Sequence, residues 1–193
     1  MSKKYLETIK AVDGSVLNLE YHQWRLERTL SLSNTHSLFK QLTPPTKGIY
    51  RCRVVYDENS IDIEYIKYFR RQVNTLKIVI SDDIDYTRKY ENRDTINELF
   101  ALRDKCDDIL IVKSGLVTDT SIANIAFYDG SRWITPKRPL LFGTTRERYI
   151  NKGVLKEEDI FVDDISKYTK VALLNAMIDF DIMSEENIED TIC

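Results

Sequence analysis

The stretch Gly143-Thr144-Thr145-Arg146-Glu147 has the residue types of an anion site. Thr144 with Glu147 three positions later has the spacing of a capping box, which predicts a helix with Thr144 as its N-cap. The first turn of a helix has unpaired backbone N–H groups and the positive end of the helix dipole, so it can hold a phosphate. The alternative is an ordinary capped helix, which these residues alone favour.

Two arginines alternate along a predicted strand over residues 48–56. Side chains alternate between the two faces of a strand, so Arg51 and Arg53 share one face. Adjacent guanidinium groups repel unless they face water or share an anion, and a carboxylate fits the guanidinium fork. The pair therefore either binds a carboxylate or lies on an exposed face that nearby acidic side chains balance.

The elements that must position these groups fall into two halves. Asp13-Gly14 predicts a hairpin turn, and apolar residues at helical spacing predict a helix over residues 20–32. Asp129-Gly130 predicts a second hairpin, between residues 122–128 and 131–135. The remaining predicted elements are a helix over 95–103 and strands over 60–69, 76–80, 108–113, 160–162, 170–174 and 180–183. The charged residues 81–93 are interpreted as the linker between the halves, with Lys89 in its middle.

The composition limits the class of protein. Of the 193 residues, 42% are hydrophobic and 31% are charged, which is typical of a soluble globular protein. The formal net charge of −3 argues against nucleic acid as the main partner. Three scattered cysteines and two distant histidines predict neither a disulfide framework nor a metal site. With no apolar leader and no apolar run near the roughly 20 residues that a membrane helix needs, we expect a cytoplasmic protein without a membrane partner.

Several stretches, in the same order, resemble the class IV aminotransferases, the fold-type IV pyridoxal 5'-phosphate (PLP) enzymes. GLVTDTSIANIAF at 115–127 resembles the pattern G-x-[VI]-x-E-x-[ST]-x-[AS]-N-[IV] of this family. Thr-Pro at 135–136 and LLFGTTR at 140–146 resemble its T-P and L-x-G-I-T-R segments. YHQWRL at 21–26 resembles its H-x-x-R-L helix, and LLNAM at 173–177 its x-x-T-N-A strand. Together these matches cover most of the chain.

The resemblance implies a fold and a set of roles. The fold is α+β with two lobes: a small N-terminal α/β lobe over residues 1–83 and a strand-rich C-terminal pseudo-barrel over residues 84–193, similar to D-amino-acid aminotransferase. By the same resemblance, Lys89 is the Schiff-base lysine and Arg25 binds the cofactor phosphate. The rest of the phosphate site and the partner of the pyridine nitrogen are then Thr144, Thr145 and Asp119.

This sequence departs from the family pattern at two places. Asp119 stands where the family has a glutamate, so the carboxylate is one methylene shorter, and the ring must sit closer or a water must bridge. The stretch that precedes the F-E-T-I-R run in longer members has no counterpart before residues 5–10, so the choice of substrate is not carried over. Asn124 matches the asparagine of the pattern and is interpreted as structural.

The family contains both lyases and aminotransferases. We expect an enzyme that resembles 4-amino-4-deoxychorismate lyase and forms 4-aminobenzoate and pyruvate through an aldimine of Lys89, with Arg51 and Arg53 holding the substrate carboxylates. The alternatives are an aminotransferase acting on an amino acid and a 2-oxo acid, and a descendant that keeps the cofactor site without catalysis. Family members usually dimerise, so the resemblance also implies a homodimer.

Overall fold

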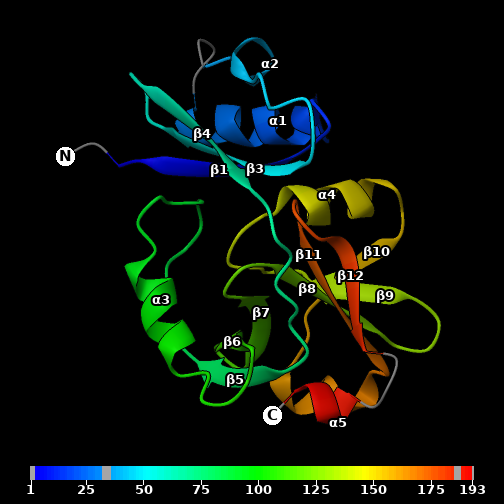
Figure 1. The fold of residues 1–193 in the computed structure, drawn as a ribbon. Helices are drawn as coiled ribbons and strands as arrows, with labels where there is room; N and C mark the ends of the chain where they lie inside the picture. The colour runs from blue at the N-terminus through cyan, green and yellow to red at the C-terminus, as the bar shows by residue number, and fades with distance from the viewer. Residues whose placement is uncertain (1–2, 32–35, 185–187, 193) are drawn as a thin grey trace. The chain divides into compact units, whose positions relative to one another are not determined.

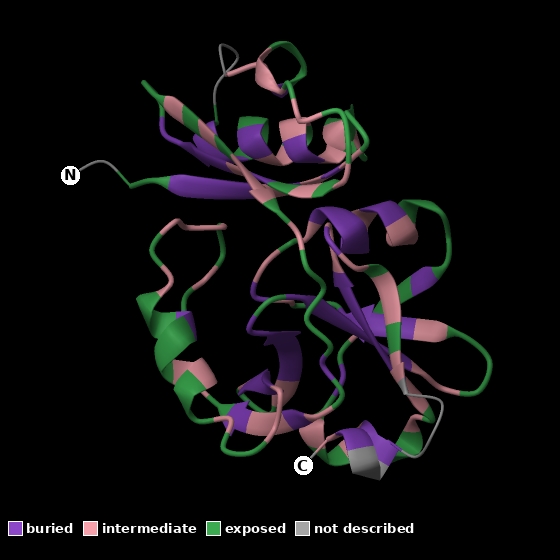
Figure 2. Cartoon of the chain, viewed as in Figure 1, coloured by how far each residue is buried: buried purple, intermediate pink, exposed green. Residues whose placement is uncertain are grey.

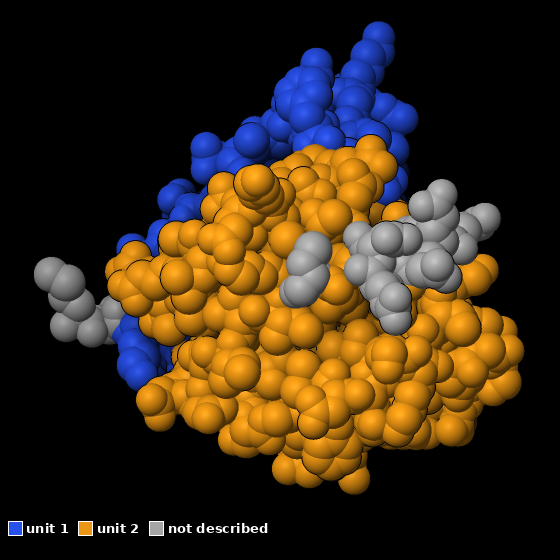
Figure 3. Space-filling view, turned by 90° about the horizontal axis from the view of Figure 1, so that it is seen from below, with its two compact units in different colours: residues 1–70, 88–92 blue, residues 71–87, 93–193 orange. Residues whose placement is uncertain are grey.

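The computed structural model describes residues 3–31, 36–184 and 188–192 and is a mixed α+β structure (Figure 1). The predicted α+β class is therefore confirmed. The chain divides into two units, which Figure 3 colours separately. Unit 1 consists of Met1–Arg70 and Arg88–Asn92, and unit 2 consists of Arg71–Thr87 and Arg93–Cys193. This division differs from the predicted boundary between residues 83 and 84, because part of the linker belongs to each unit.

Unit 1 is built on a four-stranded antiparallel sheet with the order β2-β1-β3-β4. Alternate side chains of β1 face α1, and Tyr5 and Ile9 form a buried core with Leu26 and Leu30 of that helix. Figure 1 shows α1 lying along the sheet. The elements of this unit are β1 (Tyr5–Val12), β2 (Ser15–Val16), α1 (Leu19–Leu30), α2 (Leu38–Gln41), β3 (Ile49–Tyr56) and β4 (Ile61–Lys67).

The segment Arg88–Asn92 is bound to the edge of β1 by backbone hydrogen bonds. The Leu6 amide donates to the Lys89 carbonyl at 2.8 Å, and the Glu91 amide donates to the Lys4 carbonyl at 3.0 Å. The rings of Tyr5 and Tyr90 also pack together in a tilted arrangement, with their centroids 5.7 Å apart. Lys89 is thus placed beside β1 by strand-like pairing.

Unit 2 contains an eight-stranded sheet with the order β10-β9-β8-β7-β6-β5, and β11 and β12 join it through β8. The pairs β5–β6 and β9–β10 are parallel, and the others are antiparallel. Its strands are β5 (Leu76–Ile80), β6 (Asp108–Lys113), β7 (Leu116–Thr120), β8 (Asn124–Tyr128), β9 (Trp133–Pro136), β10 (Leu155–Glu158), β11 (Lys170–Asn175) and β12 (Asp179–Ser184). Its helices are α3 (Asp94–Ala101), α4 (Thr144–Asn151), the 3-10 helix Val162–Lys167 and α5 (Ile188–Thr191).

The central strands of unit 2 carry its core. Every residue of β6 and β8 except the last is buried, as the purple strands in Figure 2 show. Leu110, Ile125, Phe127 and Leu173 are members of one apolar cluster across β6, β8 and β11. Strands buried on both faces read as continuous apolar runs, which is why the sequence predicts them well.

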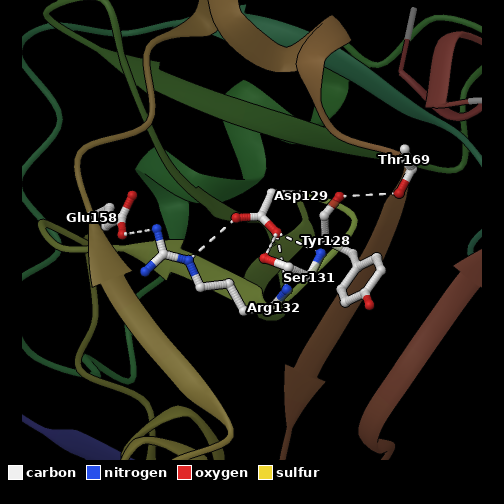
Figure 4. Close-up of polar contacts among 6 residues, drawn as sticks. All are labelled: Tyr128, Asp129, Ser131, Arg132, Glu158 and Thr169. Carbon is white, nitrogen blue, oxygen red and sulfur yellow. Dashed lines mark hydrogen bonds and ion pairs between the residues drawn. The ribbon is translucent and has the colours of Figure 1, made fainter.

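The predicted hairpin at Asp129-Gly130 is confirmed, and it joins β8 to β9 (Figure 4). One Asp129 carboxylate oxygen accepts from the amides of Ser131, at 2.8 Å, and Arg132, at 2.9 Å. These bonds, the Arg132 amide first, lower the pKa of Asp129. The Arg132 side chain also pairs with Glu158 of β10 at 2.9 Å, so the turn ties three strands together.

One predicted strand is wrong. Residues 160–162 form an isolated bridge and the start of the 3-10 helix, whereas the strand of this region is β10, which is polar and pairs in parallel with β9. Within the described residues, no helix is long and apolar enough to cross a membrane, and no group of acidic, cysteine or histidine side chains is arranged to hold a metal.

Candidate active site

A buried glutamate organises the charged cluster of unit 1. The carboxylate of Glu7, on the inward face of β1, is fully buried. It accepts from Arg25 through two bonds, Nε to Oε1 at 2.7 Å and Nη2 to Oε2 at 2.6 Å. The Nδ1 atom of His22 lies 2.6 Å from Oε2 of the same carboxylate. Arg25 and His22 lie one turn apart on α1, so the helix presents both side chains to Glu7.

The charges of this cluster follow from its burial. Burial alone would raise the pKa of Glu7, but the charge of Arg25 and the hydrogen bonds from His22 and Arg25 outweigh it and lower the pKa to about 2. Burial lowers the pKa of His22, and the positive charges of Arg25 and Lys89 lower it further. His22 is therefore a neutral donor that orients Glu7.

Lys89, the predicted Schiff-base lysine, lies in the same unit as Arg25. Its backbone pairs with Leu6, the residue before Glu7, and its charge acts on His22. Unit 1 therefore contains two of the predicted groups, Lys89 and Arg25.

Arg51 and Arg53 lie on the face of β3 opposite the buried Cys52 and Val54, as predicted. Nη2 of Arg53 lies 2.9 Å from a carboxylate oxygen of Glu91, and both side chains are about one-third exposed. Arg51 is exposed. Arg53 thus has an acidic partner, which is one of the two situations expected from the sequence, and that partner belongs to the segment that carries Lys89.

In unit 2, the carboxylate of Asp119 is buried at the end of β7. Asp119 pairs across the strands with Asn124 of β8, whose Nδ2 donates to Oδ1 of Asp119 at 2.7 Å. The Leu141 amide donates to Oδ2 at 2.8 Å. Burial raises the pKa of Asp119 to about 6, although these bonds and the charge of Arg146 act in the opposite direction.

The predicted capping box is wrong. α4 begins at Thr144, and its N-cap is Gly143, with extended backbone angles and no side-chain cap bond. The carbonyl of Gly143 accepts from the Glu147 amide at 3.0 Å. Because glycine has no side chain, the first N–H groups of α4 have no capping side chain at the N-cap position. Thr144 and Thr145, both buried, stand at this helix start, which is the arrangement that suits a phosphate.

Arg146 supports the start of α4 from within the protein. It is 1% exposed, and its Nη2 donates to the Pro136 carbonyl at 2.8 Å and to Glu157 at 2.6 Å. Arg146 and Glu7 lie in two separate stretches that resemble the family motifs, and the resemblance assigned neither residue a role. For Glu7 there was a signal, since an acidic residue stands at an inward position of an apolar strand.

The predicted site residues thus divide between the two units. Arg25, Lys89, Arg51 and Arg53 belong to unit 1; Asp119, Thr144 and Thr145 belong to unit 2. The donors suit a ligand with a phosphate at one end and a basic nitrogen at the other. The uncapped helix start and the two threonine hydroxyls fit the phosphate, and the buried carboxylate of Asp119 fits the nitrogen.

Comparison with known proteins gives the class. The family described as amino-transferase class IV matches residues 92–180. An uncharacterised protein of Haemophilus influenzae is 40% identical over 180 residues, which are 89% of this chain and 96% of that protein. A crystal structure from Haemophilus somnus, of a candidate 4-amino-4-deoxychorismate lyase, is 31% identical with a TM-score of 0.82, covering 92% of this chain and 97% of its own.

A third similar structure is a hypothetical aminotransferase of Mycobacterium tuberculosis in its PLP-bound form. It is 16% identical with a TM-score of 0.74 and covers 93% of this chain and 80% of that one. At that identity the likeness concerns the fold. Two of the matches extend over nearly the whole length at 31% and 40% identity. Together with the family match, they show that this chain belongs to the class IV aminotransferase family.

Proposed function

We propose that this protein is a PLP-dependent lyase that converts 4-amino-4-deoxychorismate to 4-aminobenzoate and pyruvate. The observation that carries the proposal is the pairing of a family match with a fitting donor set. The chain is 31% identical to the candidate lyase over nearly all of both chains. It has Lys89, Arg25 and the threonines at the α4 start, and Asp119 at the position of the family's glutamate.

Each residue has a defined task in this proposal. The cofactor phosphate is bound by Thr144, Thr145 and Arg25. The Asp119 carboxylate accepts a hydrogen bond from the protonated ring nitrogen of the cofactor. Lys89 would hold the cofactor through its Nζ, and its amine, freed when the substrate's amino group takes its place, would remove the α-proton of the substrate. When bound, PLP supplies the electron sink that makes this proton acidic.

In the same proposal, Glu7 and His22 orient Arg25 without touching the cofactor. Glu7 holds the guanidinium plane of Arg25 through both carboxylate oxygens, and His22 holds Glu7. A pre-oriented arginine loses little entropy when it binds an anion. On the outer face of the same sheet, Arg51 and Arg53 are the candidates for the substrate carboxylates, with Arg53 exchanging its partner Glu91 for the substrate.

An aminotransferase is the second candidate, because the Mycobacterium tuberculosis relative of the same fold is described as one. The two reactions share the cofactor, the lysine and the removal of the α-proton. They differ in the next event: the lyase expels the group β to that carbon, and the aminotransferase returns the proton to the cofactor. We also expect a homodimer, which light scattering on the purified protein would test.

The experiment uses purified protein with added PLP. Equal amounts of pyruvate and 4-aminobenzoate from 4-amino-4-deoxychorismate are the expected result. Formation of glutamate from 2-oxoglutarate and an amino acid, with no pyruvate from 4-amino-4-deoxychorismate, would show that the protein is an aminotransferase and not a lyase. PLP binding with neither product would indicate a non-catalytic family member, and no binding of PLP would overturn the cofactor assignment as well.

A further inference from the structure

The amide of Asn124 lies between two groups that the proposed function places at opposite ends of the cofactor. Asn124 is 5% exposed, at the start of β8. Its Nδ2 donates to Oδ1 of Asp119 at 2.7 Å and to the Leu141 carbonyl at 2.8 Å. Both hydrogens of the amide are thereby used. Leu141 in turn donates its own amide to Oδ2 of Asp119 at 2.8 Å, so the three residues form a closed ring of hydrogen bonds.

The other end of the same amide touches the start of α4. A Cβ placed on Gly143 would lie 1.9 Å from Oδ1 of Asn124, which is far inside any real contact. Gly143 has an ordinary negative φ of −76°, so its need for glycine is not conformational. The loop has glycine there because it passes directly over the Asn124 amide. One side chain therefore contacts the carboxylate, the loop and the helix N-cap.

We propose that Asn124 is a positioning residue that fixes the Asp119 carboxylate and the N-terminus of α4 to each other. The inference rests on the proposed function, in which Asp119 binds the ring nitrogen and α4 binds the phosphate. A rigid cofactor requires a set separation between these two groups. The requirement is sharper here because Asp119 is one methylene shorter than the glutamate of the family pattern and has less reach of its own.

A purely structural role for Asn124 makes a different prediction. Loss of a buried hydrogen-bonded amide would lower stability wherever it occurs, but it would leave the affinity of the folded protein for PLP unchanged. Thr135 provides the matched control. It is fully buried on the neighbouring strand β9, and its hydroxyl donates to the Ile125 carbonyl at 2.8 Å rather than to Asp119. Thr135→Ala thus removes a buried hydrogen bond to Ile125, the residue that follows Asn124.

The test measures the dissociation constant for PLP by absorbance titration, together with the thermal unfolding of each variant. Asn124→Ala is expected to weaken PLP binding by about tenfold or more, the size seen for residues that orient ligand-binding groups. Thr135→Ala is expected to stay within about twofold of wild type at a similar loss of stability. If Asn124→Ala does not fold, Asn124→Ser is judged by the same criterion.

A charge substitution adds a readout that packing alone would not move. Asn124→Asp places a second carboxylate beside Asp119, with Arg146 the nearby positive charge. Two carboxylates at that distance share a proton. PLP binding to this variant is expected to be weaker than to Asn124→Ala at pH 8 and to recover as the pH falls toward 6. An identical pH profile in the two variants would argue for a structural role alone.

A substitution at Gly143 gives an independent test of the inference. Gly143→Ala should disrupt PLP binding in the wild-type background and be tolerated beside Asn124→Ala, so the two effects should be strongly non-additive. Wild-type affinity in Asn124→Ala, or additive effects, would overturn the inference while leaving PLP binding by the wild type intact. A wild-type protein that does not bind PLP would instead overturn the proposed function and this role with it.

Discussion

Glu7 holds the guanidinium of Arg25 through both carboxylate oxygens, at 2.7 and 2.6 Å, inside the core of unit 1. Glu7 is fully buried and the Arg25 side chain is 11% exposed. Water therefore solvates neither charge well, and removing one partner would strongly destabilise the fold. The bidentate bond fixes the plane of the guanidinium. An arginine in a fixed plane is suited to bind an anion rather than merely to attract one.

Glu7→Ala is expected to lower the free energy of unfolding by about 3 kcal/mol or more, because it leaves a buried arginine without its partner. Chemical denaturation measures this loss. Glu64→Ala is the control, since Glu64 is exposed on β4 of the same sheet, and it should change stability by about 0.5 kcal/mol or less. Equal losses in the two variants would contradict the buried-pair account.

Thr145→Ala is expected to weaken PLP binding by about tenfold, because it removes a hydroxyl donor to a charged phosphate. Binding of pyridoxal, which lacks the phosphate, should not change. Thr145→Ser keeps the hydroxyl and should behave like the wild type. Titration with both ligands separates the cases: a loss of the same size for pyridoxal would place Thr145 away from the phosphate.

Asp119 predicts a pH dependence of stability in the cofactor-free protein. Its pKa is raised from 3.8 to about 6 by burial, so the native state binds more protons than the unfolded state between these values. Stability from this group is therefore present below about pH 4 and is lost as the pH rises through 6, by about 3 kcal/mol in total.

The measurement compares unfolding free energies of wild type and Asp119→Asn from pH 4 to 6.5. Glu7 and His22 titrate in both proteins, so the difference between the two curves isolates Asp119. The wild type should lose stability relative to the variant as the pH rises. A flat difference curve would show that burial does not raise the pKa of Asp119.

Arg51→Ala and Arg53→Ala are each expected to raise KM for 4-amino-4-deoxychorismate about tenfold, since each removes a charged donor to a carboxylate. The value of kcat should change less. Arg138→Ala is the control, because Arg138 is exposed and pairs with Asp159. A fall in kcat at constant KM would assign these arginines to the chemistry, and no effect would leave them as surface charges.

The elements that the sequence predicts correctly carry local signals. Asp129-Gly130 is typical of a hairpin turn between two strands, and the buried strand β6 is a run of mostly apolar residues. The strand β10 has no such signal: its Leu155 is buried and Lys156 and Glu157 are exposed, and only its parallel pairing with β9 makes it a strand. A long-range contact decided that element, so local sequence could not predict it.

The same distinction holds at the site. The family resemblance selects Arg25, Asp119 and the threonines, because they lie within recognisable motifs. The structure adds what those residues touch: Glu7 behind Arg25, and Asn124 behind Asp119. It also places the N-cap of α4 at Gly143 rather than Thr144, where a side chain from β8 leaves no room for a Cβ. Such contacts between distant segments leave no spacing pattern in the sequence.

In the proposed function, Lys89 carries the cofactor. Protein incubated with PLP, reduced with borohydride, digested and mapped by mass spectrometry should carry the cofactor mass on the peptide that contains Lys89. Lys89→Ala should carry none. Lys4→Ala, which changes an exposed lysine just before β1 whose carbonyl accepts from the Glu91 amide, should be labelled like the wild type. Equal labelling of Lys89→Ala and wild type, or a label fixed on another lysine, would contradict the account.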